Sequence, residues 1–170
     1  MLLAGFDAGQ TSTRCRIGRW QDGRWEPVGD GYGPGVCHLA SAGGVERFQD
    51  AIRVSSTEAM NVHPDLTLDG AVMGASGIEQ GSIIQEQATD LLARTLALPT
   101  AQVLATGDER TALRGAFPNH AGIVVIRGPG MLCLGRNDPG VEHRCGGWGW
   151  LLDRAVSAFD LGHQGLQPTL

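Results

Sequence analysis

The residue whose type and position most favour chemistry is Asp108. It directly follows Gly107, at the end of an expected strand over residues 102–105, and it precedes an expected helix over residues 109–116. Ligands of open α/β sheets bind at the carboxyl ends of strands, and a carboxylate there can accept a proton from a substrate hydroxyl. The alternative interpretation is that Asp108 caps the helix, and position alone supports that role at least as well.

A turn near the N-terminus has the residue types of a phosphate site. It spans residues 7–13 (DAGQTST). Gly9 allows backbone N–H groups to face an anion, and the hydroxyls of Thr11 and Thr13 add donors. Asp7 can hold Mg²⁺ through a water molecule. Taken alone, a glycine turn between two strands is usually structural.

A second glycine turn, Gly128-Pro129-Gly130, stands at the corresponding place in the second half of the chain. Each of the two turns lies between the first and second expected strands of its half. Together they suggest a nucleotide held between paired domains, with the second turn closing over the same phosphates.

Composition excludes several classes of function. The 170-residue chain is 42% hydrophobic, and it has no apolar run near the ~20 residues of a membrane helix. All 13 basic residues are arginine, so a lysine-containing P-loop is excluded. The net charge is −5 with scattered arginines, which disfavours nucleic acid and anionic membranes as partners. We expect a soluble, cytoplasmic protein without a signal peptide.

The histidines and cysteines show no ligand spacing. The five histidines are far apart, and the four cysteines contain no C-x-x-C pair. We therefore expect neither a zinc site nor a histidine-bound metal.

The elements expected in residues 1–117 form an α/β domain with a mixed sheet and helices on both faces. Alternation and apolar runs predict strands at residues 2–6, 13–20, 25–28, 70–73 and 102–105. Asp22-Gly23 indicates a hairpin, residues 7–11 a turn and residues 29–35 a glycine-rich loop. Helical spacing predicts helices at residues 45–60 and 109–116, and one after the N-cap Ser82 that Pro99 closes.

After residue 117 the strand pattern begins again. Strands are expected at residues 122–127, 131–135 and 141–144, followed by a helix over residues 150–159. The chain is thus expected to hold one domain at residues 1–117 and the first part of a second, similar domain at residues 118–170. We expect this incomplete domain to associate, as a homodimer or through its open sheet edge.

Four segments in order resemble the sugar kinases of the actin/Hsp70/hexokinase superfamily. They are residues 5–13 (GFDAGQTST), 104–116 (LATGDERTALRGA), 122–130 (GIVVIRGPG) and 146–152 (GGWGWLL). In combination they are most similar to the N-acetylglucosamine kinase branch, the BadF/BadG/BcrA/BcrD ATPase family. The resemblance covers nearly the whole chain and implies a ribonuclease H-like (actin-like ATPase) fold.

The resemblance also implies roles, with ATP and Mg²⁺ as cofactors and a small sugar as substrate. Asp108 would be the base that accepts the proton of the sugar 6-hydroxyl, and Asp7 would face Mg²⁺ through water. The phosphates would be held by Gly9, Gln10, Thr11, Ser12, Thr13, Gly128 and Gly130. The sugar pocket would be lined by Gly35, Cys37, His38, Gly147, Trp148 and Gly149.

Four positions differ from the pattern of that family. Pro129 stands where the family has a threonine, which removes a hydroxyl and one backbone N–H. Cys37 stands where it has an asparagine. Arg154 replaces an acid expected to bind the sugar, and Val156 replaces a glycine. These replacements predict weaker sugar binding.

Two further interpretations stay open beside the kinase. The chain can be a catalytically impaired or truncated member that binds a nucleotide, a sugar or a partner without turnover. It can also be an ATPase component without sugar kinase activity, which would need only the loop around Asp7 and Gly9.

Overall fold

The computed structural model describes residues 1–128, 130–149, 151–153, 155 and 157–166. The chain divides into two compact units, Met1–Asp108 and Glu109–Leu170. The division between the units therefore falls after residue 108, earlier in the sequence than the boundary expected after residue 117. The reason is that the helix that follows β5 groups with the second unit.

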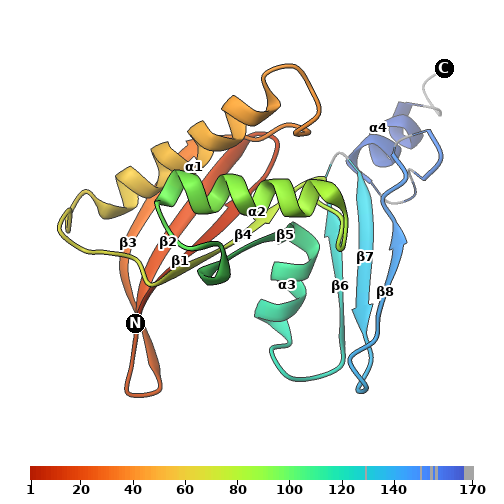
Figure 1. The fold of residues 1–170 in the computed structure, drawn as a ribbon. Coiled ribbons are helices and arrows are strands. Elements are labelled where there is room, and N and C mark those ends of the chain that lie inside the picture. Colours follow the sequence, from red (N-terminus) through yellow and green to blue (C-terminus); the bar gives the residue numbers. More distant parts are fainter. Residues whose placement is uncertain (129, 150, 154, 156, 167–170) are drawn as a thin grey trace. The chain divides into compact units, whose positions relative to one another are not determined.

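The first unit contains a five-stranded mixed sheet (Figure 1). Its strands, in the order β3-β2-β1-β4-β5, are β1 (Leu2–Ala8), β2 (Ser12–Gln21), β3 (Arg24–Pro34), β4 (Gly70–Ala75) and β5 (Val103–Gly107). β1 pairs antiparallel with β2, and β2 with β3, whereas β1, β4 and β5 run parallel. The carboxyl ends of the three parallel strands consequently share one edge of the sheet.

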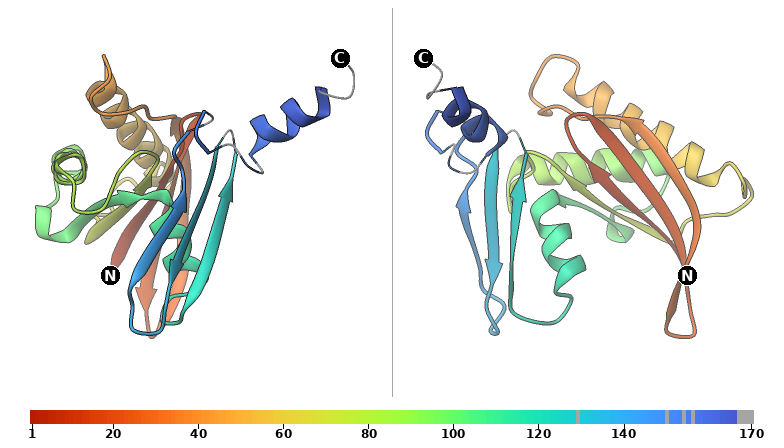
Figure 2. Two further views of the ribbon diagram at one scale, coloured as in Figure 1. Left: turned by 90° about the vertical axis from the view of Figure 1, so that its right-hand side faces the viewer. Right: turned by 180° about the vertical axis from the view of Figure 1, so that it is seen from behind.

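Both helices of this unit, α1 (Gly44–Met60) and α2 (Ile83–Leu96), cover the same face of the sheet (Figures 1 and 2). They contact each other, α1 packing on β2 and β3 and α2 on β5. The sequence placed helices on both faces, and within this unit they share one. The largest fully buried apolar side chains of this sheet and its two helices are those of Ile17, Phe48, Ile52, Met73 and Leu92.

Residues 29–34 are part of strand β3, which corrects the expectation of a glycine-rich loop. Gly29, Gly31 and Gly33 alternate along β3 and face α1. A Cβ atom on Gly29 would come within 3.0 Å of the carbonyl oxygen of Ala59, and one on Gly31 would do so at Ser55. The glycines are therefore the residues that let the helix approach the strand, and they do not mark a break in it.

The connection between β1 and β2 is shorter than expected. β1 continues through Asp7 to Ala8, so Asp7 is a strand residue and not part of a turn. The next hairpin matches its prediction, since Asp22 and Gly23 both have positive φ, 54° and 73°. Two such residues form the type of turn that suits the twist of a two-residue hairpin.

The second unit contains a three-stranded antiparallel sheet in the order β6-β7-β8. The strands are β6 (Gly122–Arg127), β7 (Met131–Arg136) and β8 (Glu142–Gly146). Helix α3 (Asp108–Ala116) is tied to this sheet because Arg110 Nε and Arg114 Nη2 form ion pairs with Glu142 of β8, at 3.0 and 3.7 Å. These contacts explain why α3 groups with the second unit.

The last helix, α4 (Ala158–Leu166), begins later than the expected start at residue 150. Ser157 Oγ accepts a hydrogen bond from the backbone N–H of Asp160 at 3.1 Å, so Ser157 serves as the N-cap. The described residues among 150–157 form no helix. Across the described ranges, no helix is both long and apolar enough to cross a membrane.

Candidate active site

Backbone hydrogen bonds bring three loops together at the carboxyl end of β1. The N–H of Ser76, just after β4, donates to the carbonyl of Ala8 at 3.1 Å. The N–H of Val36, just after β3, donates to the carbonyl of Gly9 at 2.9 Å. These bonds use the carbonyls of the last residue of β1 and of the residue after it, so the start of the loop at residues 9–11 is held from both sides.

The predicted phosphate loop and the predicted sugar loop lie directly against each other. A Cβ atom on Gly35 would fall within 3.0 Å of the backbone of Gln10 and Thr11. The carbonyl of Gly35 also accepts a hydrogen bond from Arg47 Nε of α1 at 2.8 Å. The sequence predicted that Gly35 lines a sugar pocket, which stays a prediction, and the structure shows that Gly35 packs against the loop at residues 9–11.

The amides that can face an anion lie at the tip of this loop. The N–H of Gly9 donates to the carbonyl of Ser12 at 3.0 Å and is therefore already used. Within the described part of the chain, the N–H groups of Gln10 and Thr11 have no hydrogen-bond acceptor. Because Gln10, Thr11 and Ser12 are exposed, the loop presents amide donors and two hydroxyls to solvent.

Thr13 differs from the role expected of it. Its side chain is fully buried, and its hydroxyl donates to the carbonyl of Pro34 at 2.8 Å. This proton is committed to joining β2 to the end of β3, so the hydroxyl is not placed to donate to a phosphate. The sequence pattern could not distinguish Thr13 from Thr11, because burial at this position depends on the neighbouring strand.

Asp7 is the carboxylate that the sequence predicts to face Mg²⁺. Its side chain is exposed near the carboxyl end of β1, next to the loop at residues 9–11. The described residues contain no group of three or more His, Cys, Asp or Glu side chains that could hold a metal by themselves.

Asp108 stands at the same edge of the sheet. It directly follows β5 as the first residue of α3, and its side chain is half-buried. Gly107 is in register with Ala75, and Ala75 with Ala8. Two strand spacings therefore separate the ends of β1 and β5, roughly 10 Å. A phosphoryl group and its acceptor fit across such a span.

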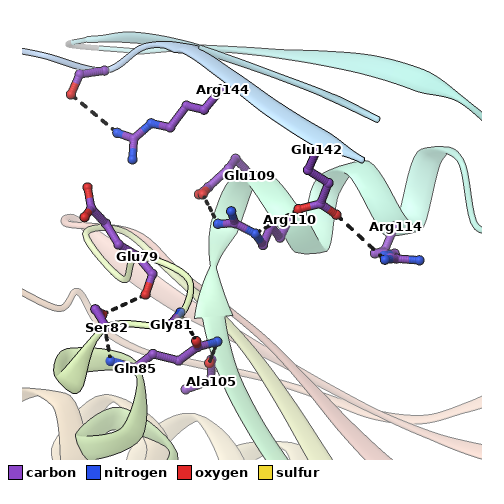
Figure 3. A network of polar contacts seen from close by, with 11 residues as sticks. Glu79, Gly81, Ser82, Gln85, Ala105, Glu109, Arg110, Arg114, Glu142 and Arg144 are labelled. Atoms are coloured by element: carbon purple, nitrogen blue, oxygen red, sulfur yellow. Dashed lines mark hydrogen bonds and ion pairs between the residues drawn. The ribbon is translucent and has the colours of Figure 1, made fainter. Parts of the chain in front are cut away.

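Gln85 of α2 contacts the strand that precedes Asp108 (Figure 3), and Thr89 of the same helix does so too. Gln85 Nε2 donates to the carbonyl of Ala105 at 3.1 Å, and Gln85 Oε1 accepts from the N–H of Gly81 at 2.7 Å. Thr89 Oγ1 accepts from the N–H of Ala105 at 3.2 Å. Because β5 is the edge strand of its sheet, these bonds satisfy the backbone groups that have no further strand to pair with. They hold β5 in place three residues before Asp108.

Thr106 is a candidate site residue that sequence reasoning missed. It is in register with Gly74 and Gly74 with Asp7, so Thr106 and Asp7 share a face of the sheet with no side chain between them. Thr106 is 6% exposed, and its hydroxyl has no hydrogen-bond partner among the described residues. The signal that the sequence offered for Thr106 was a polar residue in an otherwise apolar strand.

Cys37 and His38 follow the loop that supports residues 9–11. Cys37 is half-buried with a free thiol, and His38 is exposed. His38 Nδ1 accepts a hydrogen bond from the N–H of Ala40 at 3.2 Å. Gly77 of the loop after β4 lies beside the His38 ring. His38, which belongs to the loop after β3, therefore contacts the loop after β4.

The remaining predicted residues belong to the second unit. The N–H of Gly128 donates to the carbonyl of Gly130 at 2.9 Å, which closes the turn after β6, and Pro129 lies outside the described residues. Gly147 and Gly149 have positive φ, 81° and 85°, and Trp148 between them is 75% exposed. Arg154 and Val156, the other departures from the family pattern, also lie outside the described residues.

Comparison with known proteins gives two curated relatives. The chain is 33% identical over 97 residues to the N-acetylmuramic acid/N-acetylglucosamine kinase of Clostridium acetobutylicum, a match that covers 57% of this chain and 30% of that protein. It is 29% identical over 137 residues to the N-acetyl-D-glucosamine kinase of Dictyostelium discoideum, covering 78% of this chain and 41% of that protein. This chain resembles the N-acetylglucosamine kinases. The matched segment covers less than half of either curated relative, so the chain corresponds to only part of each.

Solved structures confirm the fold of this chain. A protein assigned as an N-acetylglucosamine kinase from Chromobacterium violaceum matches with a TM-score of 0.71 and 23% identity, over 98% of this chain and 55% of that one. A protein with the same assignment from Porphyromonas gingivalis matches with a TM-score of 0.73 and 17% identity, over 98% and 54%. The fold is that of the actin-like ATPases, as the sequence predicts. No family model matches the sequence.

Proposed function

We propose that this chain acts in phosphoryl transfer from Mg-ATP to the 6-hydroxyl of N-acetylglucosamine or a related amino sugar. The observation that carries the proposal is the meeting of an anion-type loop and a strand-end carboxylate at one edge of the first sheet. The resemblance to kinases of N-acetylated amino sugars supplies the substrate class.

The loop at residues 9–12 is proposed to bind the β- and γ-phosphates. The amides of Gln10 and Thr11 and the hydroxyls of Thr11 and Ser12 are donors on an exposed loop whose backbone is held by Val36 and Ser12. Phosphoryl transfer requires mainly positioning and charge stabilisation, so a rigid loop of donors suits it. Asp7 would hold Mg²⁺ through water, and bound Mg²⁺ would neutralise charge on the phosphates.

Asp108 is proposed to accept the proton of the attacking sugar hydroxyl. A half-buried carboxylate at a strand end fits this role, and the hydrogen bonds of Gln85 and Thr89 to Ala105 limit its movement. The hydroxyl of Thr106 is proposed to hydrogen-bond a bound ligand or a water on the face of Asp7, because it is buried without a partner among the described residues. Both assignments concern residues of the first unit.

The roles of the second unit follow from the resemblance alone. We propose that Gly128 and Gly130 contact phosphates and that residues 147–149 contact the sugar. A cytoplasmic location and self-association also stay predictions.

The test is ADP release from Mg-ATP with and without N-acetylglucosamine, for the chain and for Asp108→Asn. We expect sugar-dependent release that falls by about 10²–10⁴-fold in the variant, the usual contribution of a general base. Asp65→Asn, at an exposed aspartate in the loop before β4, is the matched control and should keep full activity. Nucleotide affinity should stay unchanged in Asp108→Asn.

Other outcomes would reassign the chain. Sugar-independent ADP release would indicate an ATPase component. Nucleotide or sugar binding by folded protein with no release would indicate a binding module without turnover. Full sugar-dependent activity in Asp108→Asn would remove Asp108 from the role of base.

A further inference from the structure

Two cysteines that sequence reasoning treated as scattered are direct neighbours in the second sheet. Cys133 of β7 and Cys145 of β8 are partners in the antiparallel register. Directly opposed residues of an antiparallel pair point to the same face of the sheet. The fold therefore places these two thiols side by side, although eleven residues separate them in the chain.

The spacing of such a pair suits a covalent bond. Opposed residues in antiparallel strands have Cα atoms about 4.5–5.5 Å apart, and disulfides span Cα distances of about 4.4–6.8 Å. The Cβ atoms of opposed residues are about 4.5–5.5 Å apart, slightly more than the roughly 3.5–4.5 Å of a disulfide. A small approach of the two strands is required, and β8 is free to make it within this sheet because it is an edge strand.

The pair is also reachable from solvent. Cys145 is exposed and Cys133 half-buried, and both are free thiols. On the same face, Val125 lies beside Cys133 and is 55% exposed, and Ile123 in the next row is 69% exposed. Cys15 differs, since it is 1% exposed within the first unit. An oxidant in solution therefore reaches Cys133 and Cys145, and not Cys15.

We propose that Cys133 and Cys145 form a reversible oxidation site that closes to a cross-strand disulfide in the presence of a hydroperoxide. One thiolate attacks a peroxide oxygen and becomes a sulfenic acid, with release of water or an alcohol. The second thiol then attacks that sulfur and displaces water. Two thiols are oxidised by two electrons and the peroxide is reduced. A strained or exposed disulfide is reduced again by dithiols.

The experiment uses the chain as it is. The protein is treated with hydrogen peroxide, remaining thiols are alkylated, and peptides cut after arginine are mapped by mass spectrometry without reduction. Arg136 and Arg144 lie between the two cysteines, so the disulfide joins two separate peptides, residues 128–136 and 145–154. We expect this cross-linked species to form, the other two cysteines to be alkylated after denaturation, and dithiothreitol to remove the link.

Single variants assign the chemistry. Cys133→Ser and Cys145→Ser should each lose the cross-link, and the remaining cysteine of the pair should end as a sulfenic or sulfinic acid. Cys37→Ser, at a half-buried cysteine of the first unit, should keep it. Oxidation of Cys145 to a sulfinic acid in the unmodified chain without a link to Cys133, or a link between two chains only, would overturn the proposal. The mapping of the unmodified chain decides this even if a variant fails to fold.

Discussion

A Cβ atom on Gly35 would come within 3.0 Å of the carbonyl oxygen of Gln10, so the loop after β3 and the loop after β1 leave no room for a side chain between them. This close approach connects the residues proposed to bind phosphate with those proposed to bind sugar. A substitution in one loop should therefore change the affinity for the ligand that the other loop is proposed to bind.

Gly35→Ala should weaken nucleotide binding. The added methyl group must displace the backbone at Gln10 and Thr11, whose amides are the proposed phosphate donors. We expect a loss in Mg-ATP affinity of about tenfold or more, equal to about 1.4 kcal/mol, measured by titration calorimetry. Gly115→Ala is the control, since a Cβ there meets open space. Equal affinity in both variants would show that the loop at residues 9–11 does not bind the nucleotide.

Thr106→Val should raise stability and lower ligand affinity. The hydroxyl of Thr106 is buried and unpaired among the described residues, so replacing it with a methyl group should raise the free energy of unfolding by on the order of 1 kcal/mol. If the hydroxyl serves a ligand, affinity for Mg-ATP or sugar should fall in the same variant. Urea unfolding and ligand titration measure the two effects, and a loss of stability would mean that the hydroxyl has a partner within the protein.

Thr89→Val should loosen the strand that precedes Asp108. The N–H of Ala105 loses its acceptor, Thr89 Oγ1, and becomes an unpaired group on an edge strand. We expect faster amide hydrogen exchange at Ala105 and a lower kcat with little change in KM. Thr95→Val is a matched control, because Thr95 Oγ1 donates only within its own helix, to Leu91. Exchange at Ala105 that is the same in both variants would contradict a positioning role.

Gly31→Ala should destabilise the first unit. Its Cβ would come within 3.0 Å of Ser55 and Ala59, both backbone contacts of α1. Overpacking of this kind costs about 1–3 kcal/mol, which urea unfolding followed by circular dichroism can measure. The same substitution at Gly115 should leave stability unchanged or raise it, because alanine favours a helix. A neutral effect at Gly31 would show that α1 can move away from β3.

Cys15 should make stability depend on pH in the alkaline range. Burial, with a smaller contribution from Asp30, raises the pKa of the Cys15 thiol from 9.0 to about 12. Between these values the unfolded chain loses the proton that the folded chain keeps, so the stabilising effect is complete below pH 9 and is lost as pH rises towards 12. The free energy of unfolding should fall by up to about 1.4 kcal/mol per pH unit relative to Cys15→Ala. Parallel slopes for the two proteins between pH 9 and 11 would contradict the shift.

The sequence was informative where local pattern decides structure. An apolar run located β1, alternation located β2, helical spacing located α1 and α2, and Asp22-Gly23 marked the hairpin that the structure contains. The glycines of β3 were misinterpreted because they are required by the close packing of α1, which the local pattern of residues 29–35 does not reveal. The late start of α4 depends on Ser157 as N-cap, whereas the sequence predicted a helix from residue 150.

In the candidate site, too, local pattern revealed some features, and others depend on how the strands pack. A carboxylate after a strand identified Asp108, and a glycine turn identified the loop after β1. Burial of Thr13 and the packing of Gly35 on Gln10 depend on which strands become neighbours, so no local pattern could reveal them. The pairing of Cys133 with Cys145 likewise follows from the register of β7 and β8.

The close packing of β3 on α1 also sets how much variation each position can absorb. Along β3, tolerance should alternate: Gly29, Gly31 and Gly33 admit no larger residue, whereas Asp30 and Tyr32 between them face solvent. Along α1, the restriction recurs every fourth residue, at Ala51, Ser55 and Ala59. Sequence variation is therefore expected on the solvent-facing side of β3 and on the solvent-facing side of α1, and relatives that keep this architecture should share small residues at these six positions.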